Sequence, residues 1–451
     1  MAEDLSLSSL TQDWGSPESV ELYLDRCQVD TPSKIVAAVW RHIQERRDSV
    51  RAVVDFGAGD GRFAYGGNYE KYVGYEIDVS RFADTRLPSN ASLVSQCAFS
   101  AHIETADVCV GNPPYVRNQD LPVGWRQEAA ACLFAKTGVR ISGLANAWQY
   151  FFLLALASTK ADGLVALIIP YEWVSRPSAA SLRDYIRAHG WNVMVYRLLD
   201  DTFNRVLTTS SITIVDKRCT DGEWKFYEES PDGTFRALST EAGSESGVLA
   251  YANRQQSRVS RYQAKRGLSP GTQEVLTLTE GERVHSGLVI DRDVVPCITS
   301  LRGLDPSKLT LTQKVFDREF RMIGAKCWLV RTDRKPSARL QAYFDSISSN
   351  RYQTATCLQR EKWWQFSMPD TPSLLVATGF RGTFPKVIVN AIGAKAVGGV
   401  SGVFGVPQNK RSKLAAALRS QDVSERIISH SNGLKKIEIN QLNTLLQNLA
   451  I

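Results

Sequence analysis

Residues 51–63 (RAVVDFGAGDGRF) contain a short apolar run that breaks into three glycines at alternating positions. The apolar run predicts a buried strand, and the glycines predict a tight turn where a ligand can approach the backbone closely. Asp55 ends the strand and Asp60 lies within the turn. Two carboxylates would repel a pyrophosphate, so a cationic ligand suits this turn better than a dinucleotide. The segment therefore predicts an α/β domain with a ligand at the carboxyl end of its first strand.

A second strand is predicted at residues 72–77 (YVGYEI), and it carries Glu76 near its end. Glu76 lies 21 residues beyond Asp55, which is about the separation at which an acid on the second strand reaches ribose hydroxyls in Rossmann-like folds. The alternative interpretation is that Glu76 only forms a surface salt bridge at the end of its strand. Together with the glycine turn, Glu76 favours a nucleoside-containing ligand.

The rest of the first half alternates between helix and strand patterns. The continuous apolar run at residues 163–170 (GLVALIIP) is typical of a strand in the middle of a sheet that is covered on both faces. About seven strands are expected, so we predict an α/β fold with a doubly wound, seven-stranded Rossmann-like sheet. Residues 116–142 are expected to form a long polar loop that folds over DNA or closes on the substrate. The other expected elements are helices at 146–160 and 177–189 and strands at 192–198 and 211–216.

The stretch from Ala106 to Tyr115 (ADVCVGNPPY) places an Asn, a rigid Pro pair and an aromatic ring at the end of a further apolar strand. Asn112 can accept a hydrogen bond on its side-chain oxygen, and Pro113 lacks an N–H but keeps its carbonyl. Two acceptors suit a planar amino group with two hydrogens, and Tyr115 offers a ring face for stacking a nucleobase. The alternative is an Asn-Pro turn that ends a buried strand.

Taken in this order, the motifs resemble those of S-adenosylmethionine-dependent DNA amino-methyltransferases, specifically the γ-type N6-adenine enzymes of restriction-modification systems with TaqI-type architecture. Upstream, residues 30–36 (DTPSKIV) are similar to the family's N-terminal cofactor motif. The same residues would start a helix with Thr31 as N-cap and Pro32 at the first position, and both interpretations can hold. Asn at position 112, where cytosine-N4 enzymes usually carry Ser, favours adenine. The resemblance covers about residues 20–215.

The resemblance implies roles for particular residues. Phe203 falls where family members carry an aromatic residue that sandwiches the target base, although an apolar residue at a loop end is equally often part of a core. No metal is expected. The implied catalytic residues are Asn112, Pro113, Pro114, Tyr115 and Phe203. The implied ligands of S-adenosylmethionine are Thr31, Asp55, Gly57, Gly59, Glu76, Ile77, Gln96 and Cys97.

The third strand departs from the family pattern. It usually ends in an Asp that meets the adenine amino group of the cofactor, whereas residues 95–99 here (SQCAF) contain no carboxylate. Gln96 can accept that hydrogen bond through its amide oxygen, and Cys97 does so poorly. We therefore expect a weaker affinity for the cofactor.

The second half of the chain is more basic than the first. Residues 1–220 carry 22 Lys or Arg against 25 Asp or Glu, whereas residues 221–451 carry 32 against 22. We expect a catalytic domain over residues 1–218 and an α+β target-recognition domain over residues 222–451, with double-stranded DNA and a cognate restriction endonuclease as partners. A basic segment is often only a solvated helix face. The candidate DNA-binding residues are Arg254, Arg258, Arg261, Lys265 and Arg381.

Other features of the sequence bear on where the protein works and on its alternative functions. The eight cysteines contain no Cys-x-x-Cys pair, which favours reduced thiols in a cytoplasmic protein. The N-terminus lacks a signal-peptide pattern, and the most apolar helix pattern is too short to span a bilayer, so no membrane association is expected. The alternatives to DNA adenine methylation are an RNA adenine methyltransferase, a protein-glutamine methyltransferase and a catalytically lapsed DNA-binding specificity protein.

Overall fold

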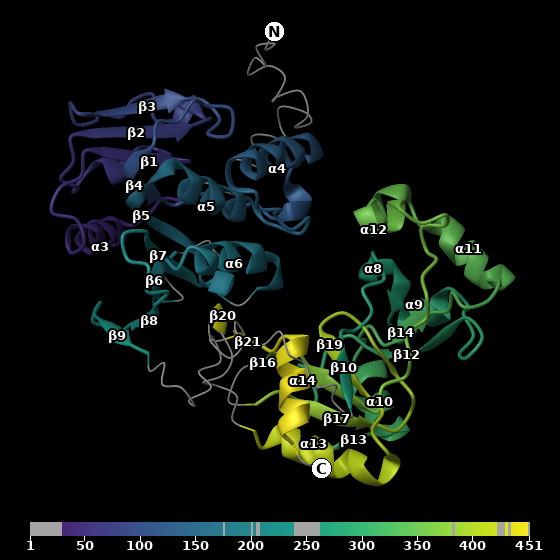
Figure 1. The fold of residues 1–451 in the computed structure, drawn as a ribbon. Helices are drawn as coiled ribbons and strands as arrows, with labels where there is room; N and C mark the ends of the chain where they lie inside the picture. The colour runs from purple at the N-terminus through teal and green to yellow at the C-terminus, as the bar shows by residue number, and fades with distance from the viewer. Residues whose placement is uncertain are drawn as a thin grey trace. The chain divides into compact units, whose positions relative to one another are not determined.

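The computed structural model contains two compact units (Figure 1). One consists of Met1–Ala252 with His430–Asn432, and the other of Asn253–Ser429 with Gly433–Ile451. The structure describes residues 29–174, 176–199, 202–203, 208–238, 262–380, 384–421, 429–431 and 434–449.

A nine-stranded sheet organises the first unit, in the order β3-β2-β1-β4-β5-β7-β6-β8-β9. Strands β1 to β5 pair in parallel, and β7 runs antiparallel to both β5 and β6. The mixed α/β fold is confirmed, but the sheet has nine strands where seven were expected. The strands are β1 (Ala52–Phe56), β2 (Lys71–Glu76), β3 (Ala91–Ser95), β4 (Ala106–Gly111), β5 (Thr159–Pro170), β6 (Asn192–Arg197), β7 (Ser210–Asp216), β8 (Trp224–Glu229) and β9 (Phe235–Ala237).

Helices cover both faces of this sheet. The apolar side chains of α3 (Ser33–Gln44) recur at helical spacing, and they pack with Leu164, Ala166 and Ile168 of β5 in one core cluster. Helix α5 (Ala147–Ser158) contacts β4 and β5 but contributes no residue to that cluster, so it covers the opposite face. Coverage on both sides explains why the apolar run in β5 is continuous. Helix α6 (Ala180–Ala188) follows β5.

The segment at 116–142 is not the loop that the sequence predicts. It contains a 15-residue helix, α4 (Val123–Thr137), which packs against α5. The Ala-rich stretch from 128 to 136 has high helix propensity, and Gly138 ends the helix in the left-handed conformation at φ 71°. The loop prediction was wrong because the helix propensity of this stretch outweighs the effect of its polar residues.

The first unit also extends beyond the predicted boundary at residue 218. Strand β8 pairs in parallel with β6, and β9 pairs with β8. The ring of Tyr227 on β8 stacks on Tyr196 of β6, with ring centroids 4.5 Å apart. Residues 224–237 therefore complete the sheet of the first unit, because they cover what would otherwise be an open strand edge.

The second unit is built from small sheets and short helices. Its sheets have the orders β10-β19-β15-β17-β13 and β11-β14-β12-β18. Two apolar clusters form its core, one of which includes Trp328, Phe344 and Trp364. Its strands are β10 (Gln263–Lys265), β11 (Thr277–Leu278), β12 (Val294–Ile298), β13 (Thr310–Leu311), β14 (Trp328–Val330), β15 (Leu374–Ala377), β16 (Gly379–Phe380), β17 (Val387–Asn390), β18 (Lys395–Ala396), β19 (Val400–Phe404) and β21 (Leu434–Lys436); β20 is Ser429–Ser431. Its helices are α8 (Gln273–Leu276), α9 (Glu280–His285), α10 (Gln313–Phe316), α11 (Ala338–Ser346), α12 (Ala355–Leu358), α13 (Gln408–Arg419) and α14 (Ile439–Asn448).

Within the described part of the chain, no helix is both long and apolar enough to cross a bilayer.

Candidate functional site

A cavity lies at the carboxyl ends of β1, β2 and β4 in the first unit. The parallel strands bring their loops to the same edge of the sheet, where open α/β folds bind ligands. Nine of the residues predicted from the sequence line this cavity together. They are Thr31, Gly57, Gly59, Glu76, Ile77, Gln96, Cys97, Asn112 and Pro114.

The glycine turn forms the floor of the cavity. Gly57 has φ +74°, and a Cβ atom at this position would lie 3.1 Å from Cδ of Pro114. Gly59 has φ +58°, and a Cβ atom there would lie 3.1 Å from a guanidinium nitrogen of Arg81. Both backbone conformations are unfavourable for residues with a Cβ. The glycine turn therefore lies in close contact with the Pro pair and with Arg81.

Glu76 is fixed at one wall of the cavity. Its Oε2 accepts a hydrogen bond of 2.9 Å from the backbone N–H of Gly59, and its Oε1 accepts one of 3.0 Å from the N–H of Asp78. Each carboxylate oxygen can accept a further hydrogen bond. Glu76 can thus brace the glycine turn and still accept hydroxyl groups of a ligand.

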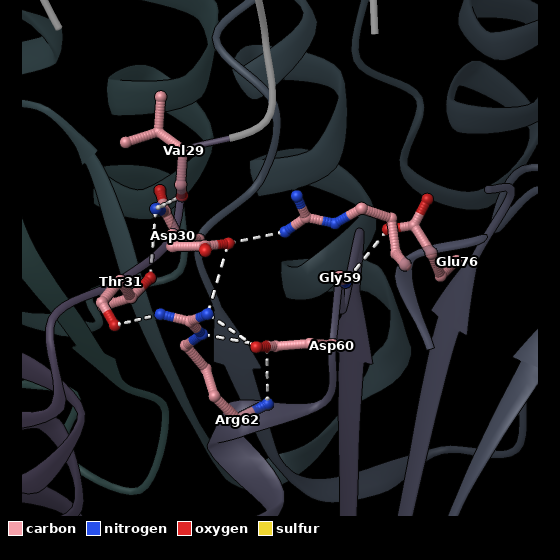
Figure 2. Close-up of polar contacts among 9 residues, drawn as sticks. Val29, Asp30, Thr31, Gly59, Asp60, Arg62 and Glu76 are labelled. Atoms are coloured by element: carbon pink, nitrogen blue, oxygen red, sulfur yellow. Dashed lines mark hydrogen bonds and ion pairs between the residues drawn. The ribbon is translucent and has the colours of Figure 1, made fainter. Parts of the chain in front are cut away.

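Residues 29–31, which we call the strap, cross the cavity ahead of α3 (Figure 2). The Arg62 guanidinium donates to the backbone carbonyl of Thr31 at 2.6 Å and pairs with Asp60 at 2.5 Å and with Asp30 at 3.2 Å. Arg81 pairs with the same Asp30 carboxylate at 2.6 Å. Two cations therefore fasten the strap to the glycine turn and to the segment after β2.

This network keeps the Asp60 carboxylate ionised. Burial opposes its ionisation, but the hydrogen bonds and the charge of Arg62 outweigh burial and lower the pKa of Asp60. Asp30, Asp60 and Glu76 contribute three carboxylates to the cavity lining, against the two guanidinium groups of Arg62 and Arg81. A cationic ligand is favoured by this balance, as the sequence predicts.

Asn112 lies at the end of β4 and points its amide nitrogen at the strap. Its Nδ2 donates to the Thr31 hydroxyl at 3.2 Å and toward the Val29 carbonyl at 3.5 Å. Thr31 is not the N-cap of α3 as predicted, because Pro32 occupies the N-cap position. No residue within the described ranges donates to Oδ1 of Asn112 or to the Pro113 carbonyl. Asn112 lines the cavity, so its Oδ1 can accept from a substrate there, whereas Pro113 is buried next to it.

An aromatic cluster forms the apolar end of the cavity, beside Gln96 and Cys97. Trp125 of α4 and Phe151 of α5 line the cavity with them. The Phe99 ring packs edge-on against both, with centroids 5.2 Å from Trp125 and 5.0 Å from Phe151. This end of the cavity can hold a flat apolar ring system beside the amide of Gln96.

Asp55 supports the site from below and does not line it. Its side chain is fully buried, and Oδ2 accepts a hydrogen bond of 2.7 Å from the Tyr72 hydroxyl. A Cβ on Gly111, directly before Asn112, would collide with this carboxyl group. Burial raises the pKa of Asp55 to about 7, against the hydrogen bond from Tyr72. In this structure Asp55 packs against the end of β4, and its role as a direct ligand stays a prediction.

This pKa predicts a pH-dependent stability. Asp55 ionises near its ordinary value of 3.8 when unfolded but only at about 7 when folded. Its contribution to stability is therefore complete below pH 3.8 and is lost as the pH rises through 7, a loss of about 2–3 kcal/mol between pH 5 and pH 8.

Asp55→Asn removes this titration. We expect its melting temperature, relative to the wild type, to be higher at pH 8 than at pH 5 by about 5–10 °C. Thermal unfolding of both proteins at both pH values measures this difference. Parallel pH profiles would contradict a neutral Asp55.

The remaining predicted catalytic residues are not among those that line the cavity. The Tyr115 hydroxyl lies 3.5 Å from Oγ of Ser210 on β7, and burial raises its pKa. Pro113 approaches Gly57, since a Cβ there would lie 3.9 Å from Cα of Pro113. Phe203 is buried in the core cluster under α3, which agrees with its alternative role in packing.

The candidate DNA-binding residues are placed only in part. Lys265 lies on β10 and is half-exposed, with Asp370 at 3.5 Å and the Phe404 ring centroid at 5.1 Å. Such a surface ion pair contributes little to stability. Arg254, Arg258, Arg261 and Arg381 lie outside the described residues.

Sequence analysis missed Arg62, Arg81, Trp125 and Phe151. Arg62 directly follows the glycine turn, so the sequence already places it close to Asp60. The others come from separate segments and carry no local motif. Only the packing of α4 on α5 and the fold of the strap bring them to the cavity.

The sequence is similar to those of known restriction-modification methyltransferases. Residues 81–197 match the family model of the Eco57I restriction-modification methylase. That range contains the Asn112–Tyr115 motif, Gln96 and Cys97 but not the glycine turn. The Type II methyltransferase M.XamI from Xanthomonas campestris pv. amaranthicola is 29% identical over 170 residues, which are 34% of this chain and 32% of that protein. The chain thus spans about a third of the curated relative that it matches.

Two solved structures are similar at low identity. The methyltransferase subunit of the type I restriction-modification system from Streptococcus thermophilus is 18% identical, with a TM-score of 0.38, and the match covers 50% of this chain and 52% of that one. The type IIG restriction endonuclease BpuSI is 13% identical, with a TM-score of 0.43, and covers 92% of this chain and 58% of that one. The family-model match and the curated relative confirm the expected resemblance to restriction-modification methyltransferases.

Proposed function

We propose that this chain transfers a methyl group from S-adenosylmethionine to the N6 amino group of an adenine flipped out of duplex DNA. We further propose that it is a γ-type enzyme and the modification component of a restriction-modification system. The family-model match over residues 81–197 supports the methyltransferase class. The choice of an amino group as substrate rests on the site itself.

One observation carries the proposal. The amide hydrogens of Asn112 are directed to the strap, which leaves Oδ1 as an acceptor in the cavity, and the adjacent Pro113 would supply a second acceptor through its carbonyl. Two acceptors at adjacent residues match the two hydrogens of an exocyclic amino group. A site for a hydroxyl or a carboxylate nucleophile would not need this pair.

The residues of the cavity fit S-adenosylmethionine. Glu76 would accept the ribose hydroxyls, Gln96 would meet the adenine edge, and Ile77 would pack on the adenine ring. The strap and the glycine turn would hold the methionine end, where Thr31 is buried and lines the cavity. When bound, the cofactor would supply a methyl group on a positively charged sulfur, which is already strongly electrophilic. The excess of carboxylates in the lining suits that charge.

The chain's own residues then act on the nucleophile. The N6 lone pair of adenine is delocalised into the ring and attacks poorly in that state. Hydrogen bonds from N6 to Asn112 Oδ1 and to the Pro113 carbonyl draw the nitrogen toward tetrahedral geometry and stabilise the positive charge that develops on it. Neither acceptor is basic enough to keep the proton, so the N6 proton passes to water after transfer.

The base must leave the helix to reach these acceptors. Flipping costs a few kcal/mol because it breaks stacking and pairing. Stacking on the Tyr115 ring would return about 1–3 kcal/mol of that cost. The anchor of the Tyr115 hydroxyl near Ser210 supports this role, because it limits rotation of the ring. Phe203 remains a weaker candidate for the second face of the base, since it is buried in the core.

Target recognition is proposed for the second unit, together with binding of duplex DNA and of a cognate restriction endonuclease. Residues 253–451, which contain the second unit, carry 30 Lys or Arg against 15 Asp or Glu, and this positive charge supports the DNA-binding part.

Incubation of the protein with tritiated S-adenosylmethionine tests the proposal. The substrates are unmethylated duplex DNA, total RNA and a protein extract, each followed by nucleoside or amino-acid analysis. We expect label in the N6-methyl-2′-deoxyadenosine of DNA. Label only in RNA adenine or in glutamine would replace the proposed substrate, and no label with retained DNA binding would identify a catalytically lapsed specificity protein.

Glu76→Ala is expected to weaken cofactor binding. It removes charge-assisted hydrogen bonds to ribose and also frees the Gly59 amide, which together should raise the dissociation constant by about 10- to 100-fold, or about 1.5–3 kcal/mol. Calorimetric titration with S-adenosylmethionine measures this change. Glu104→Ala is the matched control, because Glu104 is a highly exposed carboxylate that pairs only with Lys71 among the described residues. Equal affinities of the two variants would remove Glu76 from the binding site.

A further inference from the structure

The orientation of the Asn112 amide is set by its neighbours in the strap. An amide group presents an acceptor on one side and two donors on the other, and rotation by half a turn exchanges them. Only one of the two orientations leaves Oδ1 to accept from a substrate. What fixes the orientation therefore decides whether the site holds two acceptors or one.

The Val29 carbonyl and the Thr31 hydroxyl differ in what they can select. A carbonyl oxygen only accepts, so the Val29 carbonyl requires the NH2 side of Asn112, but its distance of 3.5 Å makes this a weak constraint. The Thr31 hydroxyl lies closer, at 3.2 Å, and accepts from the same nitrogen. Its own proton is left to donate into the cavity that Thr31 lines. A hydroxyl could equally donate to Oδ1, so the Val29 carbonyl selects the orientation of the amide, and the closer Thr31 hydroxyl holds the amide in place.

The position of Thr31 does not depend on Asn112. Its side chain is only 3% exposed, and its backbone carbonyl is held by Arg62 at 2.6 Å. Arg62 is in turn held by Asp60 in the glycine turn. A contact with a well-anchored hydroxyl restricts the rotation of Asn112 more than a contact with a mobile group would.

We propose that Thr31 is a positioning residue for the transfer step, because its hydroxyl, together with the Val29 carbonyl, holds the Asn112 amide with Oδ1 facing the substrate amino group. This inference rests on the proposed function and adds a second role for Thr31 beside contact with the cofactor. The same hydroxyl would then join the cofactor half and the base half of the site.

Substitution of Thr31 separates the two roles. Thr31→Val keeps the shape of the buried side chain and removes the hydroxyl. At saturating S-adenosylmethionine we expect its single-turnover rate of DNA methylation to fall by about 10- to 100-fold, because a misoriented acceptor cannot be restored by more cofactor. Thr31→Ser keeps the hydroxyl and is expected to rescue most of the rate. Ser33→Ala removes an exposed hydroxyl two residues away and serves as the matched control.

Two results would overturn the inference. If saturating cofactor returned Thr31→Val to the wild-type rate, Thr31 would act only in binding the cofactor. If Ser were as slow as Val, the methyl group and not the hydroxyl would matter.

A second measurement keeps the inference separate from the proposed function. The side-chain amide resonances of Asn112, assigned by their loss in Asn112→Ala, should shift in Thr31→Val and stay close to the wild type in Thr31→Ser. If the wild type methylates no nucleic acid, the proposed function fails, and these resonances alone decide the inference. Unchanged resonances in Thr31→Val would then refute it.

Discussion

Replacing Asn112 by Ala is expected to lower the rate of methyl transfer by about 10³-fold, the largest effect on activity that we predict. The substitution removes an acceptor that acts on the substrate nitrogen as its charge develops, and loss of one such preorganised group costs about 10²–10³ in rate. The remaining acceptor, the Pro113 carbonyl, cannot engage both amino hydrogens. Single-turnover methylation of duplex DNA at saturating cofactor measures the loss.

Cofactor affinity should change much less in Asn112→Ala. The strap loses its contacts with the amide nitrogen but stays fastened by Arg62 and Arg81, so calorimetric affinity should stay within a few fold of the wild type. Asn68→Ala is the matched control, because Asn68 is exposed and lies outside the cavity lining. Turnover close to that of Asn68→Ala would rule out amino-group methylation at Asn112.

Replacing Arg47 by Met is expected to be the most destabilising change in the first unit. Arg47 makes a two-point ion pair with Asp216 of β7, at 2.6 Å and 3.1 Å, and both side chains are almost fully buried. It also donates to the backbone carbonyls of Asp162 and Gly163. Removing one partner leaves a buried charge unpaired, at a cost of about 3–5 kcal/mol. This corresponds to a fall in melting temperature of about 10 °C.

Lys71→Met provides the matched control for that prediction. Lys71 pairs with Glu104 at 3.3 Å, and both side chains are more than half exposed. An exposed pair contributes about 0–1 kcal/mol, so this variant should melt close to the wild type. Thermal unfolding of the two variants side by side tests the contrast. Equal melting temperatures would mean that Asp216 finds another partner when Arg47 is lost.

The local patterns of the sequence predicted most of the strands that carry the site. The apolar run ending at Phe56, the strand that ends at Glu76 and the strand before Asn112 all lie where their residue types and periods place them. Strand patterns are local because alternate side chains face alternate sides, and a continuous apolar run requires cover on both faces. The same reasoning failed for residues 123–137, where polar side chains on an exposed helix resemble those of a loop.

The sequence by itself determined the chemical parts of the site: the glycine turn, the acid at the end of β2, and the Asn-Pro-Pro-Tyr motif. These depend on backbone conformations and donor or acceptor types that a few adjacent residues fix. Only the tertiary structure decided how they are used. It buries Asp55 beneath Gly111, turns the Asn112 amide toward a strap 81 residues earlier in the chain, and fastens that strap with Arg62 and Arg81. Hydrogen-bond partners far apart in sequence are selected by the packing of whole elements, and no short-range pattern encodes that packing.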